Sequence, residues 1–326
     1  MRSTLSRSTL GAAAFLVMTG LLSTAVATGP AAAASAPLSH PGVVAHFDLA
    51  AGQTPENIVV GPDGSTDVTF VGSRQIAHVD VHGRTTVLAT LPLPADGGVN
   101  TPITGAAVPT GIARAADGTL FVAYAAGDSR STGLWRVRPG GEPQRIAALP
   151  ATSFPNGIAL DGTSKNVYIA DSSLGTVWKV PVRGGAARRW ATDPALDRTS
   201  FAGANGLKFH GGAVWVTNTD EGTLLRIPVS GRGSAGAVQV RATGLTNVDD
   251  FAFTGRGDQA FAALFGSSQV VLVRAGGGHR VVLDGSDGLQ NPTAVAVLDS
   301  TVTVGSSARQ TGTDPNLLAA HLSGHR

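Results

Sequence analysis

Cysteine is absent from this sequence of 326 residues. Disulfide bonds are therefore excluded, and so are metal sites built on thiolates, which leaves oxygen and imidazole groups as the available metal ligands. Charged residues are also scarce, at 14% of the chain, whereas glycine is abundant, with 43 residues. Many glycines combined with few charges favour short strands joined by tight turns over long solvated helices.

The chain also lacks a strong excess of charge of either sign. Its formal net charge is +2, and its arginines are scattered along the sequence. The one short basic run, Arg183 to Arg189, has no aromatic residues interleaved for stacking on bases. Nucleic acid is therefore not an expected partner.

The N-terminal segment has the features of an export signal. Arg2 and Arg7 precede an apolar stretch from Leu10 to Val26, and small residues follow from Ala31 to Ala36. A membrane anchor is the alternative, but the apolar stretch is short for a spanning helix and is interrupted by polar residues. We therefore predict a signal peptide over residues 1–34, a linker over 35–42, and a secreted, extracellular protein without stable membrane insertion.

A short pattern recurs six times along the rest of the chain: a polar or acidic residue, then a small or polar residue, then an apolar run. Its first residues follow one another at intervals of about 44 to 54 positions, and strand-like segments with tight turns fill each interval. A period of this size is typical of a radially repeated β-architecture. We predict an all-β, six-bladed β-propeller over residues 43–326, with four antiparallel strands per blade. The first residues of the six repeats are Glu56, Thr110, Asn156, Asn205, Asp249 and Thr293.

The sixth repeat lacks an outermost strand. It contains strand-like segments at 293–297, 301–305 and 317–322, after which the chain ends, while an unassigned strand-like segment, Val43 to Asp48, precedes the first repeat. Pairing that segment with the last blade would close the ring and remove two exposed edges. A stray leader segment is the alternative. A closed ring leaves no obligatory edge to pair, so a monomer is expected.

The first residues of the repeats should converge, because the innermost strands of a propeller surround a central channel. Glu56 and Asp249 bring carboxylates, and Asn156 and Asn205 bring amide oxygens. Such a set suits Ca²⁺ or another hard divalent cation. Without a cation the two carboxylates would repel each other, and the pKa of at least one should rise. A purely structural ring is the alternative, because Asn-Gly is a common turn sequence.

These residues carry a resemblance to a known family. The chain resembles the calcium-dependent six-bladed propellers of the gluconolactonase and regucalcin (senescence marker protein) group, within the wider set that contains diisopropylfluorophosphatase and the paraoxonases. In that group a Glu of the first blade, Asn of the third and fourth and Asp of the fifth hold the metal. No arginine stands at a position that we can assign to substrate binding. The matching positions here are Glu56, Asn156, Asn205 and Asp249, with Asp250 as an alternative to Asp249.

The resemblance implies a secreted, calcium-dependent hydrolase whose small-molecule substrate is a lactone or a related ester. The cation would act as a Lewis acid on the substrate oxygen. Asp249 would orient or deprotonate the attacking water, or attack directly, and Glu56 would mainly anchor charge. Serine hydrolysis is not expected, because no Gly-x-Ser-x-Gly motif is present. The alternative is a non-catalytic extracellular propeller that binds a ligand, glycan or protein.

Overall fold

The computed structural model describes residues 37–323, which lie within one compact unit, Ala36–Arg326. The predicted signal peptide, residues 1–34, lies outside the described residues. Within 37–323 the helices are two single 3-10 turns, Pro194–Leu196 and Gly285–Asp287. No helix in this range has the length and apolar character needed to cross a membrane.

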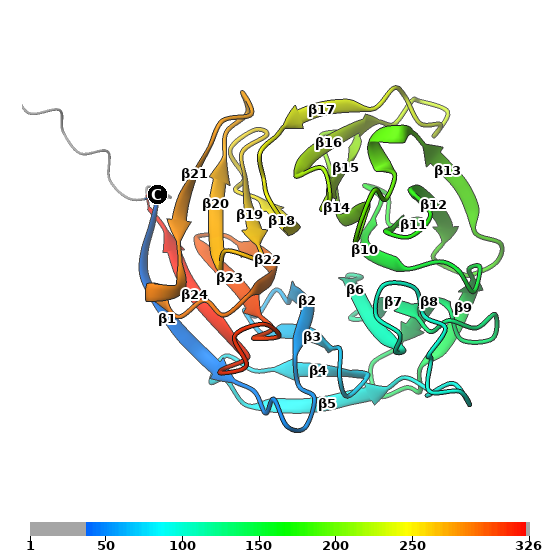
Figure 1. Ribbon diagram of the computed structural model, residues 1–326, viewed down its shortest axis with the longest axis horizontal. Coiled ribbons are helices and arrows are strands. Elements are labelled where there is room, and N and C mark those ends of the chain that lie inside the picture. Colours follow the sequence, from blue (N-terminus) through cyan, green and yellow to red (C-terminus); the bar gives the residue numbers. More distant parts are fainter. Residues whose placement is uncertain (1–36, 324–326) are drawn as a thin grey trace, which may run out of the picture. The chain divides into compact units, whose positions relative to one another are not determined.

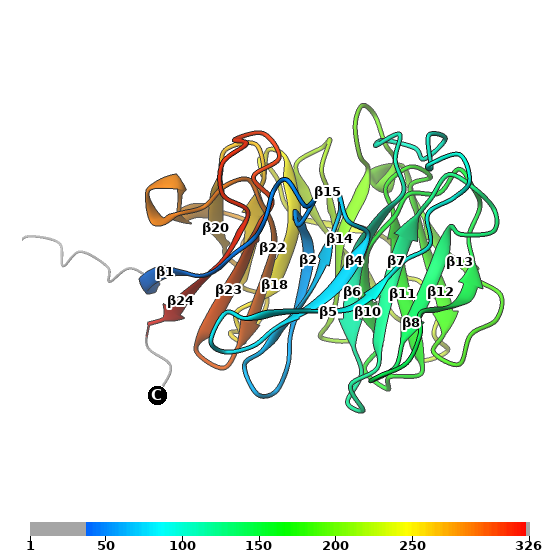
Figure 2. The same cartoon turned by 90° about the horizontal axis from the view of Figure 1, so that it is seen from below.

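The compact unit consists of six four-stranded antiparallel sheets set around a central axis, as Figures 1 and 2 show in two views. This confirms the predicted six-bladed propeller. The innermost strands are β2 (Pro55–Val60), β6 (Val108–Arg114), β10 (Pro155–Leu160), β14 (Ala204–His210), β18 (Val248–Phe253) and β22 (Pro292–Leu298). The second strands are β3 (Thr66–Phe70), β7 (Leu120–Ala125), β11 (Asn166–Asp171), β15 (Ala213–Asn218), β19 (Ala260–Leu264) and β23 (Thr301–Ser306).

Two further strands complete each blade toward the outside of the ring. The third strands are β4 (Gln75–Val79), β8 (Gly133–Val137), β12 (Thr176–Pro181), β16 (Thr223–Pro228), β20 (Gln269–Val273) and β24 (Asn316–Leu322). The outermost strands are β5 (Thr85–Thr90), β9 (Gln144–Ala148), β13 (Arg188–Thr192), β17 (Gln239–Ala242), β21 (His279–Leu283) and, in the last blade, β1 (Leu38–His46).

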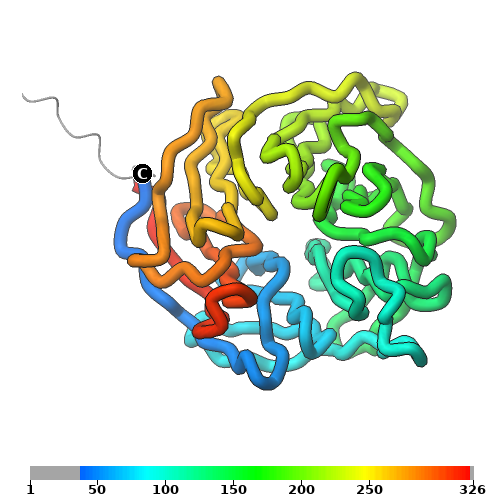
Figure 3. The backbone as a smooth tube through the Cα atoms, viewed as in Figure 1, coloured from blue at the N-terminus to red at the C-terminus, as the bar shows by residue number. Residues whose placement is uncertain are grey.

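The ring closes through the two ends of the described chain. The last blade has the strand order β1-β24-β23-β22, and Val43 of β1 pairs with Leu318 of β24. In Figure 3 the first blue segment runs beside the last red one. The predicted closure is therefore confirmed. The strand begins earlier than expected, at Leu38, so part of the segment that we assigned to a linker (residues 35–42) belongs to the blade.

The hydrophobic core lies between neighbouring blades rather than on the axis. Trp215 of the fourth blade, for example, is buried with Phe251 of the fifth, and Phe261 of the fifth is buried with Val302 of the sixth. Because side chains alternate between the two faces of a strand, each sheet can fill the space on both of its sides. Polar residues such as Glu56 and Asp249 stand near the starts of the innermost strands, at one end of the axis.

Every innermost strand has a break in register close to its start, as between Pro155 and Ile158 of β10. Such a bulge turns a side chain away from the regular ladder. In β10 the residue after Asn156 is a glycine, which allows close packing: a Cβ on Gly157 would lie 2.5 Å from the carbonyl oxygen of Asn205 on the next innermost strand. Asn156-Gly157 is therefore strand and not turn, so the turn interpretation is wrong here.

Candidate metal centre

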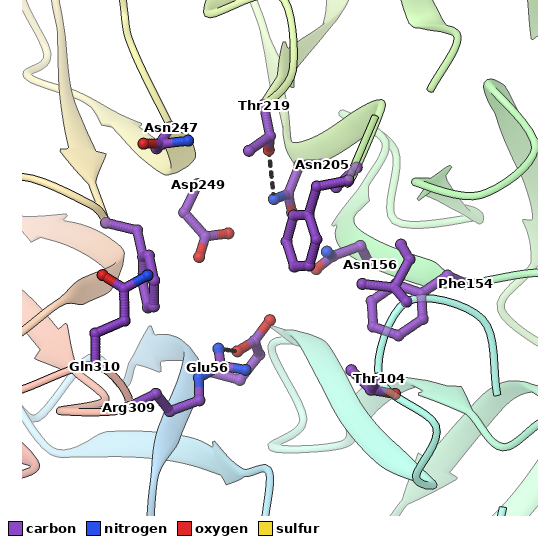
Figure 4. A pocket seen from close by; sticks show the side chains of 14 residues that line it. Glu56, Thr104, Phe154, Asn156, Asn205, Thr219, Asn247, Asp249, Arg309 and Gln310 are labelled. Carbon is purple, nitrogen blue, oxygen red and sulfur yellow. Dashed lines mark hydrogen bonds and ion pairs between the residues drawn. The ribbon is translucent and has the colours of Figure 1, made fainter. Parts of the chain in front are cut away.

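The four predicted metal ligands line one pocket of about 410 Å³ at the centre of the ring. Glu56 comes from β2, Asn156 from β10, Asn205 from β14 and Asp249 from β18. Figure 4 shows their side chains pointing into the same space. Four blades thus supply two carboxylates and two carboxamides to one site.

The two threonines of the repeat have a different place. The hydroxyl of Thr110 donates to the carbonyl of Pro155, 2.7 Å away, and that of Thr293 donates to the carbonyl of Pro55, 3.1 Å away. Both side chains are fully buried and join one blade to the next. The expectation that the first residues of all six repeats converge at the central channel is therefore wrong for these two side chains, which do not line the pocket.

Hydroxyl groups fix the orientation of both carboxamides. The Asn205 Nδ2 donates to Thr219 Oγ1 over 2.8 Å, and the Asn156 Nδ2 donates to Ser172 Oγ over 3.3 Å. Each hydroxyl spends its single proton on a carbonyl of the next blade, Val248 for Thr219 and Ala204 for Ser172. It can therefore only accept from the amide, and this keeps the amide nitrogen turned toward the hydroxyl.

One consequence is an amide oxygen without a partner. Asn205 is 6% exposed, and its Oδ1 has no hydrogen-bond partner among the described residues. An unsatisfied buried oxygen is costly unless a ligand compensates for it. Within residues 37–323 no three His, Asp or Glu side chains lie close enough to hold a metal together. A cation at this pocket would therefore need the amide oxygens, and the donor set fits a hard divalent ion.

The carboxylates of the pocket repel each other, as the sequence suggests. Burial, and next the charge of Glu56, raise the pKa of Asp249 well above its ordinary value, whereas Arg309 opposes the shift. Asp249 is therefore protonated more readily than an exposed aspartate unless positive charge arrives. Burial contributes more to this rise than the repulsion by Glu56 on which the sequence prediction rested.

Asp250, the alternative to Asp249, lies outside the pocket lining. Its carboxylate accepts from the Lys208 Nζ at 2.7 Å and from the Asn57 Nδ2 at 3.2 Å, and the residue is 1% exposed. A buried carboxylate held by a cation and an amide is already satisfied. Of the two neighbouring aspartates, Asp249 is the one that faces the pocket.

An arginine that the sequence did not reveal lines the same pocket. Arg309 lies in the loop between β23 and β24, and its Nη2 forms an ion pair with the Glu56 Oε2 (Figure 4). Its guanidinium also lies 5.7 Å from the centre of the Phe265 ring. The available signal was its place just after a second strand, where Thr219 and Phe265 also line the pocket.

The remaining wall of the pocket is largely apolar. Phe154, Phe201, Phe265 and Ile103 line it together with several polar residues. Ile103 has a φ of +69°, a conformation that is unusual for a β-branched residue. Phe201 is 60% exposed, at the pocket's edge. The site thus joins a charged end to a wall that can contact hydrocarbon.

Among residues 37–323 no histidine lines this pocket. His46 pairs with Asp314 on the outer part of the last blade, and His78 pairs with Asp67. Neither lines the central pocket. His46 belongs to β1 and His78 to β4, strands away from the axis.

No family model matches this chain, and no curated protein matches it in sequence. Among solved structures, a putative gluconolactonase is 16% identical, with a TM-score of 0.63 over 87% of this chain and 92% of that one. The calcium-binding protein regucalcin from Agrobacterium tumefaciens is 16% identical, with a TM-score of 0.61 over 82% and 89%. Virginiamycin B lyase from Staphylococcus aureus is 13% identical, with a TM-score of 0.59 over 87% and 98%. At such identities the likeness establishes a shared fold, which by itself selects none of these activities.

Proposed function

We propose that this chain is a secreted, calcium-dependent hydrolase of lactones or related esters. The observation that carries the proposal is the polar end of the central pocket, where Glu56 and Asp249 face two carboxamides held in place by hydroxyls. The unpartnered Oδ1 of Asn205 supports a cation there. The fold shared with regucalcin, described as calcium-binding, and with a putative gluconolactonase is consistent with it.

Calcium, or another hard divalent cation in its place, would polarise the substrate carbonyl when bound. Asp249 would take a proton from the water that adds to the carbonyl carbon, and would return that proton to the leaving oxygen as the ester C–O bond breaks. Burial and the charge of Glu56 raise the pKa of Asp249 in the pocket without a cation, and a bound cation would lower it and keep the carboxylate ionised. Glu56 anchors positive charge at the other side of the pocket.

The apolar wall supports a substrate with a hydrocarbon part. Phe154, Phe265 and Ile103 can contact a ring or an acyl chain while the ester group reaches the carboxylates. Burying apolar surface is worth about 25 cal/mol per Å². Binding energy for the substrate would thus come from this wall, and the chemistry from the polar end.

Removing either carboxylate tests the proposal. We expect Asp249→Ala and Glu56→Ala each to abolish the calcium-induced rise in melting temperature and any lactonase activity, because each loses an anionic ligand. Melting scans with calcium and with chelator, and a panel of lactones and esters, measure both. Asp80→Ala, at a turn carboxylate outside the pocket lining, is the matched control. Identical melting of the unmodified protein with calcium and with chelator would refute the metal site.

A non-catalytic ligand-binding propeller is the second candidate. The ion pair between Arg309 and Glu56 favours it, because that pair neutralises one carboxylate without a metal. Its aromatic wall would suit a bound ligand equally well. Substrate turnover that calcium stimulates and Asp249→Ala removes would exclude this candidate. Binding of a panel compound without turnover would favour it.

A further inference from the structure

The pocket contains its own cation in addition to the groups that suit a metal. Arg309 is the one Lys or Arg among the described residues that line the pocket, and it is paired with Glu56. The Glu56 side chain is 8% exposed and that of Arg309 is 32% exposed. The carboxylate is therefore shielded from water, whereas the guanidinium retains access to solvent.

The loop that carries Arg309 is fixed in place. Asn291 accepts hydrogen bonds through its Oδ1 from the backbone nitrogens of Gln310 and Thr311, each at 2.9 Å. The same side chain donates through its Nδ2 to the carbonyl of Phe265, at 3.2 Å. Asn291 thus bonds both to the backbone of the loop and to the backbone of Phe265, whose ring lies beside the guanidinium. The backbone of the loop is held at the pocket by Asn291, whereas the guanidinium contacts Glu56 and the Phe265 ring.

A divalent cation and Arg309 both need the charge of Glu56. A carboxylate can accept from a guanidinium and bind a metal at once, but two cations sharing one anion repel each other. We propose that Arg309 is a displaceable counter-ion of Glu56, which a divalent cation must move aside, so that Arg309 lowers the affinity of the pocket for calcium. This inference rests on the proposed function.

Competition with Arg309 would determine the calcium concentration at which the pocket fills. Calcium sites with dissociation constants of about 10⁻⁴ to 10⁻³ M occur in extracellular modules, whereas cytosolic sites bind far more tightly. With Arg309 in place, we expect the site to belong to the weak class. It would then remain with its arginine where calcium is scarce and exchange it for the metal where calcium is abundant.

Calorimetric titration with calcium chloride alone tests this in the full chain. We expect Arg309→Gln to bind calcium at least about tenfold more tightly than the unmodified protein, a difference of about 1.4 kcal/mol, because Glu56 is then free. Arg256→Gln is the matched control, since it removes the same charge at an exposed arginine outside the pocket and should leave the affinity unchanged. Arg309→Lys retains a cation, and its calcium affinity should fall between those of the unmodified protein and Arg309→Gln.

Melting in the presence of chelator guards against a folding defect. Arg309→Gln should melt at a lower temperature than the unmodified protein in chelator, because two carboxylates then face each other, and it should gain more from added calcium. Equal or weaker calcium binding by Arg309→Gln would overturn the inference while leaving the metal site standing. Absence of calcium binding in the unmodified protein and in Arg309→Gln alike would overturn the inference and the proposed function together.

Discussion

Two hydroxyls decide which atoms of the asparagines face the pocket. Ser172 and Thr219 follow the second strands of neighbouring blades, and each donates its only proton across to the next blade. The acceptor side of the hydroxyl then holds the amide nitrogen. The same bond that joins two blades therefore presents an amide oxygen to the site, and the polarity of the pocket follows from the assembly of the ring.

Thr219→Val removes this control without changing the size of the side chain. The Asn205 carboxamide would lose its fixed orientation, and we expect calcium affinity to fall by about 10-fold or more, as is usual when a residue that orients a metal ligand is lost. Thr219→Ser keeps the hydroxyl and should stay within about twofold of the unmodified protein. Calorimetric titration measures both. Unchanged affinity in Thr219→Val would show that the hydroxyl does not orient the ligand.

The four predicted ligands were accessible from the sequence because they occupy one register of a repeat. Ser172, Thr219 and Arg309 were not predicted. Ser172 and Thr219 directly follow the second strands of neighbouring blades, but their bonds to the asparagines and to the next blade form only when the ring assembles. Arg309, in the loop after β23, meets Glu56 of the first blade only through the same closure of the ring. The roles of Asp249 and Glu56 in catalysis and metal binding stay predictions that the experiments above test.

Close approach of the innermost strands explains the glycines beside the ligands. Gly157 and Gly206 both lie within strands, and a Cβ on Gly206 would stand 2.6 Å from the Asp250 Oδ1. Neither has a positive φ, so their role is space and not backbone freedom. Asn156 and Asn205 can face the axis because the glycine after each leaves room for the backbone of the next innermost strand.

Gly157→Ala tests this packing. The added methyl group would press on the backbone of β14, and we expect a loss of about 1–3 kcal/mol in the free energy of unfolding, the usual cost of overpacking. Urea unfolding in chelator measures it free of any contribution from a bound cation. Gly276→Ala is the control, because nothing lies within 4 Å of its Cβ position, and it should stay within about 0.5 kcal/mol. Equal effects of the two substitutions would contradict the role assigned to Gly157.

The start of β1 contains residues that are typical of a linker, although they belong to a strand. Pro41 and Gly42 suggest a linker, since both residues are rare inside sheets. At an outer edge, however, a proline leaves no ladder bond unmade, and β1 has a break in register between Ser39 and Gly42. The outermost position of β1 in the last blade therefore explains why this strand tolerates a proline and a glycine.

The stability of the whole ring depends on the pairing of β1 with β24 in the last blade. Strand β1 pairs with β24 and covers an edge that would otherwise be open. We expect a chain that lacks residues 1–46 to melt at least about 10 °C lower and to aggregate, because β24 then offers unpaired backbone groups. A chain that lacks only residues 1–36 keeps β1 and is the control. Calorimetry and light scattering measure the two; equal behaviour would mean that β1 is dispensable.

The loop that carries Arg309 belongs to this same blade and ends against its closing strand. The Phe47 nitrogen, just after β1, bonds to the carbonyl of Pro315 at 2.8 Å, and His46 bonds to Asp314 at 2.8 Å. A protease that nicks the first strand would thus untether one end of the arginine's loop, far along the chain from the cut. A cut in β1 would therefore alter the position of Arg309 in the pocket while the other five blades stay folded.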